Sequence, residues 1–446
     1  MAWFRSFCTA AVVPLLYGME VGATSNVLKT FQGMREHGIN SWEADLTGMK
    51  LSAVACGALL GAISGTLTAI QIADRLGRKK ELITAALFLV IGGVLSSLAN
   101  SFNLFFLGRA LFGVGEGIGM HAALLYTGEI VPARWRGFCG GSIEVVWVVG
   151  MFLINLLGMM TNNSWRESYF SLVVVSTPFL AACFILPESP RWIMLNRGSE
   201  GLAEAAFTFR KLGSPEQESI DVCNQILDGL QKDEEEGALN IKNEGGSRKA
   251  LIVGIVLVLF QQLTGQPTIL YHMGEIFYRA GVGEGGPVVV TAVKTIATVI
   301  AVSQVENFGR RPLLLTGTSI MGISLLFLSV AYSIQPPFLQ HFVILLFTTY
   351  VIGYQTGFGP VTWLLLSELF PLKERARTTS ICTLTNFCAN WVVLFGFDFV
   401  RVWFGDSLQY AMYSVLALLG LVFVYLRVPE TKGLTLEDID QRIFAM

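Results

Sequence analysis

Charged residues are scarce in this chain. Asp, Glu, Lys and Arg make up only 14% of its 446 residues, whereas hydrophobic residues make up 53%. Soluble domains carry about 25% charged residues, so the composition excludes an ordinary water-soluble protein. The mean hydropathy of +0.57 agrees and favours a protein with many membrane spans.

Cysteines are also few. The seven that occur are scattered without paired spacing, so the sequence indicates neither a disulfide framework nor a metal site. No phosphate-binding loop or nucleophile constellation is evident, and the glycine-rich stretch GVGEGIG (113–119) is better explained by close helix packing. We therefore expect no cofactor, no metal, no nucleic-acid partner and no enzymatic activity.

Long apolar runs, by contrast, are abundant. A helix needs about 20 mostly apolar residues to cross the hydrocarbon core of a bilayer. Twelve stretches qualify, near residues 7–28, 47–72, 81–100, 103–128, 137–160, 168–187, 250–278, 287–305, 312–334, 338–367, 378–400 and 408–428. The first run is longer than a cleavable signal peptide and has no clear cleavage site, so we expect it to stay in the protein.

One long polar segment divides these runs into six and six. It carries a possible amphipathic helix in GLAEAAFTFRKL. We expect an all-α membrane protein with an N-terminal six-helix half, a helical cytoplasmic linker, a C-terminal six-helix half and a cytoplasmic tail. The predicted boundaries are 1–187, 188–249, 250–428 and 429–446. Lys and Arg cluster in the loops that this topology places in the cytoplasm, so both termini are expected there.

Three short motifs recur at matched places in the two halves. DRLGRKK (74–80) and ENFGRRP (306–312) follow the second span of each half, EIVPARWR (129–136) and ELFPLKER (368–375) the fourth, and PESPR (187–191) and PETKG (429–433) the sixth. Each second copy lies 232 to 242 residues after the first. The halves therefore look like duplicates, as in transporters that hold substrate near the bilayer midplane between two rocking halves.

The repeated motifs combine acids with bases at the cytoplasmic helix ends. One basic motif alone is also explained as a positive-inside loop, and an exposed ion pair contributes only ~0–1 kcal/mol. A network that breaks when this side opens would instead bias the equilibrium between two states. Its predicted members are Asp74, Arg75, Arg78, Glu129, Arg136, Glu188, Arg191, Glu306, Arg310, Arg311, Glu368, Arg375 and Glu430.

The motifs also resemble those of a known family. DRLGRK, PESPR, PETKG, QQLTGQP (261–267), GRRP (309–312) and GFGPVTW (357–363) together are similar to the sugar porters of the major facilitator superfamily. YGMEVGATS, MHAALLY and FQQLTGQPTILY most resemble the plant-type vacuolar and plastidic carriers. The resemblance covers nearly the whole chain and implies the major facilitator fold and sugar transport.

Two ionisable residues lie at matching depth inside spans. Glu20 lies about 13 Å from the outer end of the first span, and Arg109 about 12 Å into the fourth. A charge at the centre of a membrane helix costs about 2.5–3.5 kcal/mol, so each residue is a functional candidate. The resemblance implies that proton-coupled relatives have an Asp at the position of Glu20 and an Arg at the position of Arg109. It also implies that many uniporters have a neutral Asn at the position of Glu20. We expect Glu20 and Arg109 to couple protons; the alternative is a static ion pair.

A second candidate couple is Glu144 and Lys294. The resemblance places Glu144 where most sugar porters have a sugar-binding Gln, and Lys294 where they have an Asn. We expect both to face the cavity, where a pair would neutralise itself and still bind hydroxyls. The alternative is that Glu144 titrates and joins the coupling.

Other polar residues in the spans suit sugar chemistry. Amide side chains donate and accept hydrogen bonds, as sugar hydroxyls do, and a Trp offers an apolar face. A lone Gln or Trp in a membrane helix is more often a packing residue, but the resemblance favours substrate binding. The predicted set is Gln261, Gln262, Thr268, Gln355, Trp363, Asn386 and Asn390.

Two further expectations concern these spans. The glycines and proline of GFGP (357–360) should break the helix and let it bend as an inner gate. His121 is expected to be a satisfied interior residue rather than a proton relay.

The sequence thus predicts a proton-coupled monosaccharide (hexose) transporter that works by alternating access, functions as a monomer in the lipid bilayer, and resides in the vacuolar or plasma membrane. One rival is a facilitative sugar uniporter in which Glu20 is structural. A rival of another class is a non-transporting sugar receptor, which usually has a long cytoplasmic tail.

Overall fold

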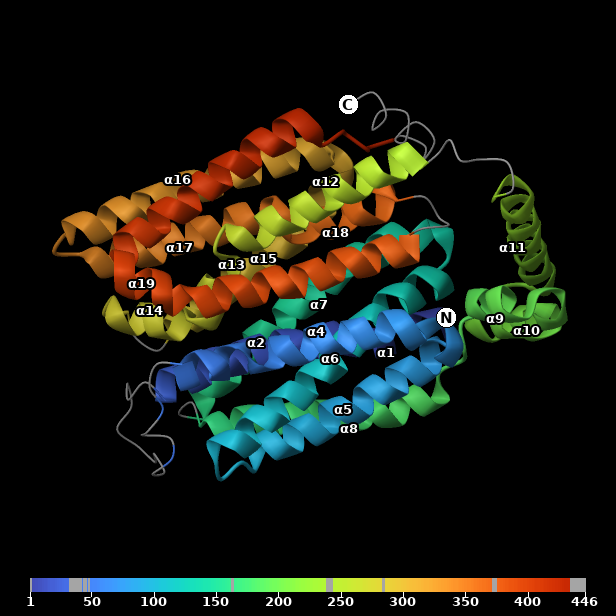
Figure 1. The fold of residues 1–446 in the computed structure, drawn as a ribbon, viewed down its shortest axis with the longest axis horizontal. Helices are drawn as coiled ribbons and strands as arrows, with labels where there is room; N and C mark the ends of the chain where they lie inside the picture. Colours follow the sequence, from blue (N-terminus) through green and yellow to red (C-terminus); the bar gives the residue numbers. More distant parts are fainter. Residues whose placement is uncertain are drawn as a thin grey trace.

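The computed structural model describes residues 2–31, 42, 46, 49–161, 164–237, 244–282, 285–370 and 375–433, and its regular elements there are all helices. Figure 1 shows two groups of long helices lying side by side, with a smaller helical group beyond one end. Apolar runs take this form because, in lipid, a helix satisfies its own backbone hydrogen bonds.

The first group comes from the N-terminal part of the chain. Its helices are α1 (Ala2–Ala10), α2 (Val12–Phe31), α4 (Met49–Leu76), α5 (Arg78–Ser97), α6 (Phe102–Ile130), α7 (Ala133–Met160) and α8 (Trp165–Ile185). Almost every residue of α2 is buried, so this helix is enclosed by its neighbours.

The second group comes from the C-terminal part. Its helices are α12 (Glu244–Leu263), α13 (Gln266–Tyr271), α14 (Met273–Arg279), α15 (Gly286–Phe308), α16 (Arg310–Ile334), α17 (Leu339–Thr356), α18 (Phe358–Leu369) and α19 (Arg375–Arg427). Contacts of α2 with α13 and α14, of α7 with α15, and of α4 with α19 join the two groups.

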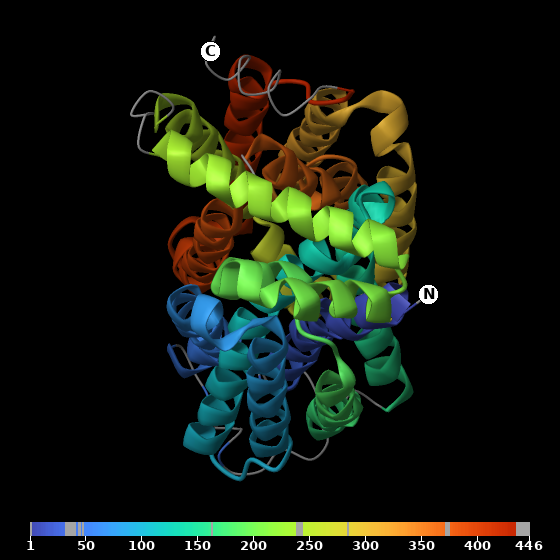
Figure 2. The ribbon, with the colours of Figure 1, turned by 90° about the vertical axis from the view of Figure 1, so that its right-hand side faces the viewer.

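The segment between the groups is helical, as the pattern of GLAEAAFTFRKL predicts. It forms α9 (Pro190–Arg197), a 3₁₀ turn (Gly198–Gly201), α10 (Leu202–Leu212) and α11 (Glu216–Gly237). A small core of its own holds it together, built on Ile193, Met194, Ala205, Ala206 and Cys223. Figure 2 shows these helices lying across the end of the two groups.

Eleven stretches of the described residues are long and apolar enough to cross a membrane. They correspond to eleven of the twelve predicted spans. The missing one is α6, which has 29 residues but includes Arg109, Glu116 and Glu129. Length and composition alone therefore support eleven spans rather than twelve.

The glycine-rich stretch of α6 lies against α4, as its composition predicts. A Cβ added at Gly113 would lie 1.9 Å from the carbonyl oxygen of Ala58, and one at Gly117 would lie 2.2 Å from that of Ala62. The two backbones touch because neither position carries a side chain.

Three long helices are interrupted. The predicted break in GFGP is confirmed: α17 ends at Thr356, and Gly357 (φ −104°, ψ −96°) leads into α18. A break that the sequence analysis did not predict separates α12 from α13 at Gly265, whose φ of +89° favours glycine. In α19 the backbone is non-helical at Gly405 (φ 76°, ψ 166°), so this element consists of two helices that meet at a kink.

Candidate functional site

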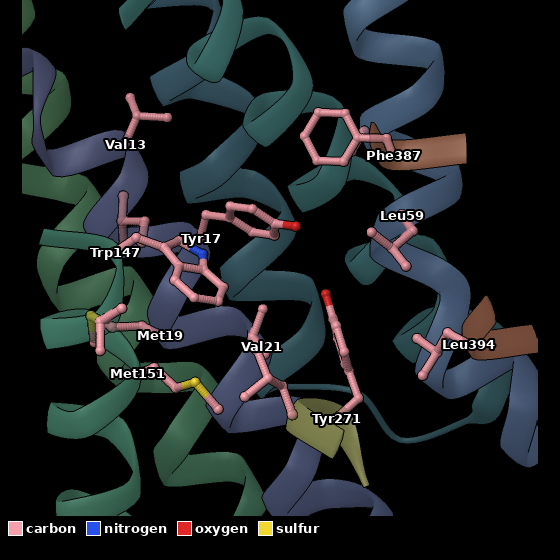
Figure 3. Close-up of a cluster of buried hydrophobic side chains, with 14 of the residues drawn as sticks. Val13, Tyr17, Met19, Val21, Leu59, Trp147, Met151, Tyr271, Phe387 and Leu394 are labelled. Atoms are coloured by element: carbon pink, nitrogen blue, oxygen red, sulfur yellow. The ribbon is translucent and has the colours of Figure 1, made fainter. Parts of the chain in front are cut away.

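A central cavity lies between the two helix groups, with an empty volume of about 750 Å³. Its wall is formed by α2, α6 and α7 on one side and by α12, α13, α17, α18 and α19 on the other. Figure 3 shows Tyr17 and Tyr271 from opposite sides pointing toward each other, with Trp147 and Val21 beside them.

Six of the predicted binding residues line this cavity: Glu144, Gln261, Gln262, Trp363, Asn386 and Asn390. Gln261 donates to the carbonyl of Phe358 (2.8 Å), just after the break at Gly357, and accepts from Asn386 Nδ2 (3.2 Å). The broken helix is thereby tied to α12 and α19.

Several polar atoms of this wall have no hydrogen-bond partner among the described residues. They are the buried atoms Gln262 Oε1, Asn390 Oδ1 and Trp147 Nε1. Because buried polar groups are normally paired, these atoms are available to a ligand rich in hydroxyl groups. The arrangement of amides among aromatic rings can thus bind a small polyhydroxyl molecule.

Thr268 lies elsewhere. Its hydroxyl forms a 2.9 Å hydrogen bond with Tyr413 Oη within the C-terminal group, and it is fully buried. The prediction that it contacts substrate is not supported by this position, because Thr268 is absent from the cavity wall that the described residues form.

Glu144 and Lys294 do not form the direct pair that the sequence predicts. The Lys294 ammonium lies 4.2 Å from the centre of the Trp147 ring and 5.8 Å from that of Tyr354. It has no hydrogen-bond partner among the described residues. It is in electrostatic range of Glu144, so the two residues are neighbours without a direct contact.

Gln355 connects this region to α15. Its Nε2 donates to Thr298 Oγ1 and lies 3.5 Å from Glu144 Oε1. Gln355 therefore orients Glu144 from behind the cavity wall.

Glu20 and Arg109 meet, as their matching depths predict. Arg109 Nη2 lies 2.8 Å from Glu20 Oε1, and the two side chains are 0% and 1% exposed. Thr24 donates to the same carboxylate oxygen (2.8 Å) and accepts from Arg109 Nη1 (2.7 Å). Tyr169 also accepts from Arg109. The cluster is thus enclosed by α2, α6 and α8.

One ionisable residue was missed by the sequence analysis. Glu116, in α6, is 0% exposed, and neither of its carboxylate oxygens has a hydrogen-bond partner among the described residues. It lies close enough to Glu20 and Arg109 to interact electrostatically with both. A charged residue inside a predicted span indicates a functional site. The glycines around Glu116 were instead interpreted as a packing motif, and the acid between them was not considered.

The aromatic wall was also missed. Tyr17, Trp147, Tyr271 and Tyr354 line the cavity, and nothing in their local sequence distinguishes them from packing residues. Their role becomes visible only when helices far apart in the chain are brought together.

His121 is satisfied inside the protein, as expected. Its Nδ1 lies 2.6 Å from Glu81 Oε1, and both side chains are buried between α5 and α6.

The predicted network of the C-terminal half is assembled around Arg310. Its guanidinium contacts Glu306 (2.8 Å) and Glu368 (2.7 Å). Glu430 accepts the backbone N–H groups of Arg310 and Arg311 (3.0 Å each), while the Arg311 side chain donates to Tyr425 O (2.6 Å).

The N-terminal half has a corresponding arrangement. Arg78 Nε lies 3.4 Å from Glu129 Oε1, and Arg191 is in electrostatic range of Glu129. Glu188 accepts the backbone N–H groups of Lys79 (3.0 Å) and Ser189 (2.9 Å). In the described part of the structure, the contacts of Glu188 and Glu430 are with backbone at the start of a helix, where N–H groups lack partners.

Arg75 is exposed. The side chains of Asp74, Arg136 and Arg375 lie outside the described part of the structure. Where ion pairs of this network are described, each joins residues of one helix group.

The opposite ends of the helices are held by a buried acid that the sequence analysis did not identify. Glu275, in α14, contacts Arg279 (2.7 Å), His272 (3.0 Å) and Arg401 of α19. Next to it, the Gly274 N–H donates to Ser25 Oγ of α2 (3.2 Å). This contact joins the two helix groups at the end farther from α9–α11.

Comparison with known proteins identifies clear relatives. Residues 7–443 match the family model described as "Sugar (and other) transporter". The chain is 37% identical to "D-xylose-proton symporter-like 2" of Arabidopsis thaliana over 98% of its own length and 90% of the relative's. It is 28% identical to the "Galactose-proton symporter" of Escherichia coli K12, over 99% of the chain and 94% of that protein.

Solved structures resemble the fold closely. The proton:xylose symporter XylE bound to 6-bromo-6-deoxy-D-glucose superimposes with a TM-score of 0.80 at 25% identity, covering 99% of both chains. A partially occluded, inward-open form of the xylose transporter XylE from E. coli gives a TM-score of 0.81 at 24% identity, over 97% of this chain and 99% of that one.

Proposed function

Because this chain belongs to the sugar transporter family of the major facilitator superfamily, we propose that it is a proton-coupled monosaccharide transporter that works by alternating access. The family consists of transporters rather than enzymes. Several relatives are named as proton symporters of xylose, galactose or arabinose, so the substrate class is a monosaccharide, and a hexose fits it.

The observation that carries the proposal is the buried Glu20–Arg109 pair beside a cavity lined by amides. An ion pair isolated from water is stable only while both partners keep their charge. Protonation of Glu20 releases Arg109, whereas deprotonation restores the pair. A proton can thereby change the packing of α2 against α6, next to the sugar site.

Sugar binding is assigned to the cavity wall. Gln261, Gln262, Asn386 and Asn390 supply donors and acceptors, and Trp363 supplies the apolar face of the site. Glu144 adds an acceptor. Gln355 and Lys294 act from behind the wall, by orienting Glu144 and by supporting Trp147.

The remaining architecture follows from the same proposal. If α6 is counted as a span that carries functional charges, the chain has twelve membrane-spanning helices. The halves 1–187 and 250–428 rock about the cavity. The ion network around Arg310 and Arg78 holds the cytoplasmic helix ends of each half. Both termini lie in the cytoplasm, and the protein functions as a monomer in the vacuolar or plasma membrane.

The test is uptake of labelled hexoses into proteoliposomes, with and without an imposed proton gradient. We expect wild type to accumulate sugar above equilibrium only with the gradient. Glu20→Gln should lose accumulation but keep equilibrative exchange. Glu167→Gln, which removes an exposed acid of α8, is the control and should behave as wild type. Equilibration without a gradient by all three proteins would instead identify a facilitator.

A further inference from the structure

Two buried carboxylates share one buried arginine in this protein. One oxygen of Glu20 is bound by Arg109 and Thr24, whereas Glu116 has no hydrogen-bond partner for either oxygen among the described residues. If both acids were ionised, the cluster would hold one uncompensated negative charge away from water, which is very costly. The arrangement is therefore that of an ionised Glu20 and a neutral Glu116.

The other groups around Glu116 do not change the net charge of this cluster. Tyr17 of α2 and Tyr271 of α13 interact with it electrostatically, and both are neutral at ordinary pH. The neighbouring glycines of α6 contact α4 and α5 through uncharged residues: Ala58, Ala62, Thr66, Ala85 and Leu89. Arg109 is thus the cation that Glu20 and Glu116 have in common.

The helix places Glu116 farther from the outer side than Glu20 and in electrostatic range of Arg109. Arg109 and Glu116 are seven residues, or two turns, apart on one face of α6, about 10.5 Å along the axis. Both side chains tilt toward the N-terminus of the helix, so Arg109 must change its rotamer to pair with Glu116. One turn beyond Glu116, Met120 lines the cavity. Arg109 Nε and Glu20 Oε2 have no hydrogen-bond partner among the described residues, so the cluster has capacity for a second arrangement.

We propose that Glu116 is a second proton-binding group: a proton taken up by Glu20 passes to Glu116, and Arg109 pairs with whichever carboxylate is ionised. This inference rests on the proposed symport. In the empty cluster both acids are ionised. A proton from outside then forms an O–H bond on Glu20, and Arg109 moves to Glu116. Transfer breaks that O–H bond, forms one on Glu116, and returns Arg109 to Glu20, as in this structure. Release from Glu116 toward the cavity and the cytoplasm empties the cluster again.

The consequence is that Arg109 never loses its carboxylate partner. Without Glu116, protonation of Glu20 would leave a buried guanidinium unpaired. With Glu116, the empty cluster carries excess negative charge and therefore binds a proton at higher pH than a single pair would.

The first test is a double-mutant cycle of thermal unfolding on the purified protein. Glu20→Gln and Glu116→Gln each leave Arg109 one carboxylate, so each should lower Tm only slightly. The double variant leaves Arg109 none and should lower Tm by far more than the sum of the two single shifts. Additive shifts would overturn the shared-cation arrangement, and this readout does not depend on transport.

The second test is uptake into proteoliposomes. We expect Glu116→Gln to keep sugar exchange, to lower proton-driven accumulation at neutral pH about five- to tenfold, and to regain accumulation at lower external pH. Glu167→Gln is again the control. If wild type accumulates sugar and Glu116→Gln accumulates it equally at every pH, the relay is overturned while symport stands. If wild type does not accumulate sugar, the proposed symport itself fails.

Discussion

At the residue scale, Glu144 in the cavity wall and Lys294 behind it are neighbouring opposite charges without a direct contact. Lys294 lies on the face of Trp147 rather than against Glu144. The ring face attracts the cation, and Glu144, in electrostatic range, compensates its charge. Each charge therefore depends on the other without a direct hydrogen bond.

Removing one of these charges should lower the free energy of unfolding more than removing both. Lys294→Met leaves Glu144 without a compensating cation, and we expect the free energy of unfolding to fall by about 3 kcal/mol. The double variant Lys294→Met, Glu144→Gln should recover most of that loss. Thermal unfolding in detergent measures the cycle, and a double variant as unstable as Lys294→Met would contradict the coupling.

Sequence reasoning at this scale succeeded where depth along a helix decides the contact. Glu20 and Arg109 meet because both lie at the same level of adjacent helices. It failed where side-chain packing decides, as for Lys294 on Trp147 and Thr268 on Tyr413. It also missed Glu116, whose glycine neighbours suggested packing alone.

At the element scale, backbone contact between helices determines how the broken helix is positioned. A Cβ added at Gly317 of α16 would lie 2.4 Å from both Gly353 O and Gly357 N, at the junction of α17 and α18. The break that carries Gln355 and Trp363 is therefore packed directly against α16.

Gly317→Ala should disturb this junction. Because the contacts are backbone atoms that cannot rotate away, we expect a loss of about 1–3 kcal/mol in stability and weaker sugar transport. Gly396→Ala is the matched control: a Cβ there meets nothing within 4 Å, and the exchange of glycine for alanine favours the helix. Thermal unfolding and exchange assays compare them, and equal behaviour of the two variants would contradict the account.

Helices were more predictable than their interruptions. All eleven spans that length and composition support were predicted from the apolar runs. The break at Gly357 follows from the residues of GFGP. The break at Gly265 was not predicted because QQLTGQP has only one glycine and one proline inside an apolar run. The close approach of Tyr413, 2.6 Å from a Cβ built at Gly265, depends on a residue far along the chain.

At the scale of the whole molecule, the two helix groups enclose the cavity between them and meet through α14 and α2 at the end farther from α9–α11. The ion pairs described around Arg78 and Arg310 lie within one group each. The groups can therefore separate at the end nearer α9–α11 without breaking a described ion pair.

Alternating access predicts a change in distance between the groups. Spin labels at Leu98 and Phe338, which are 65% and 66% exposed at the outer ends of the two groups, should change separation on sugar addition. Labels at Leu98 and Met160, the latter 74% exposed in the same group as Leu98, should not. Pulsed electron paramagnetic resonance measures both pairs, and an unchanged first distance would argue against rocking halves.

The central claim is that sugar and proton move together through the site built on Glu20. The direct measurement is internal pH in proteoliposomes while sugar flows inward down its own gradient, with no proton gradient imposed. We predict that wild type acidifies the lumen in proportion to sugar uptake and that Glu20→Gln carries sugar without acidification. Sugar uptake by wild type with no change in internal pH would contradict symport and leave Glu20 as a structural partner of Arg109.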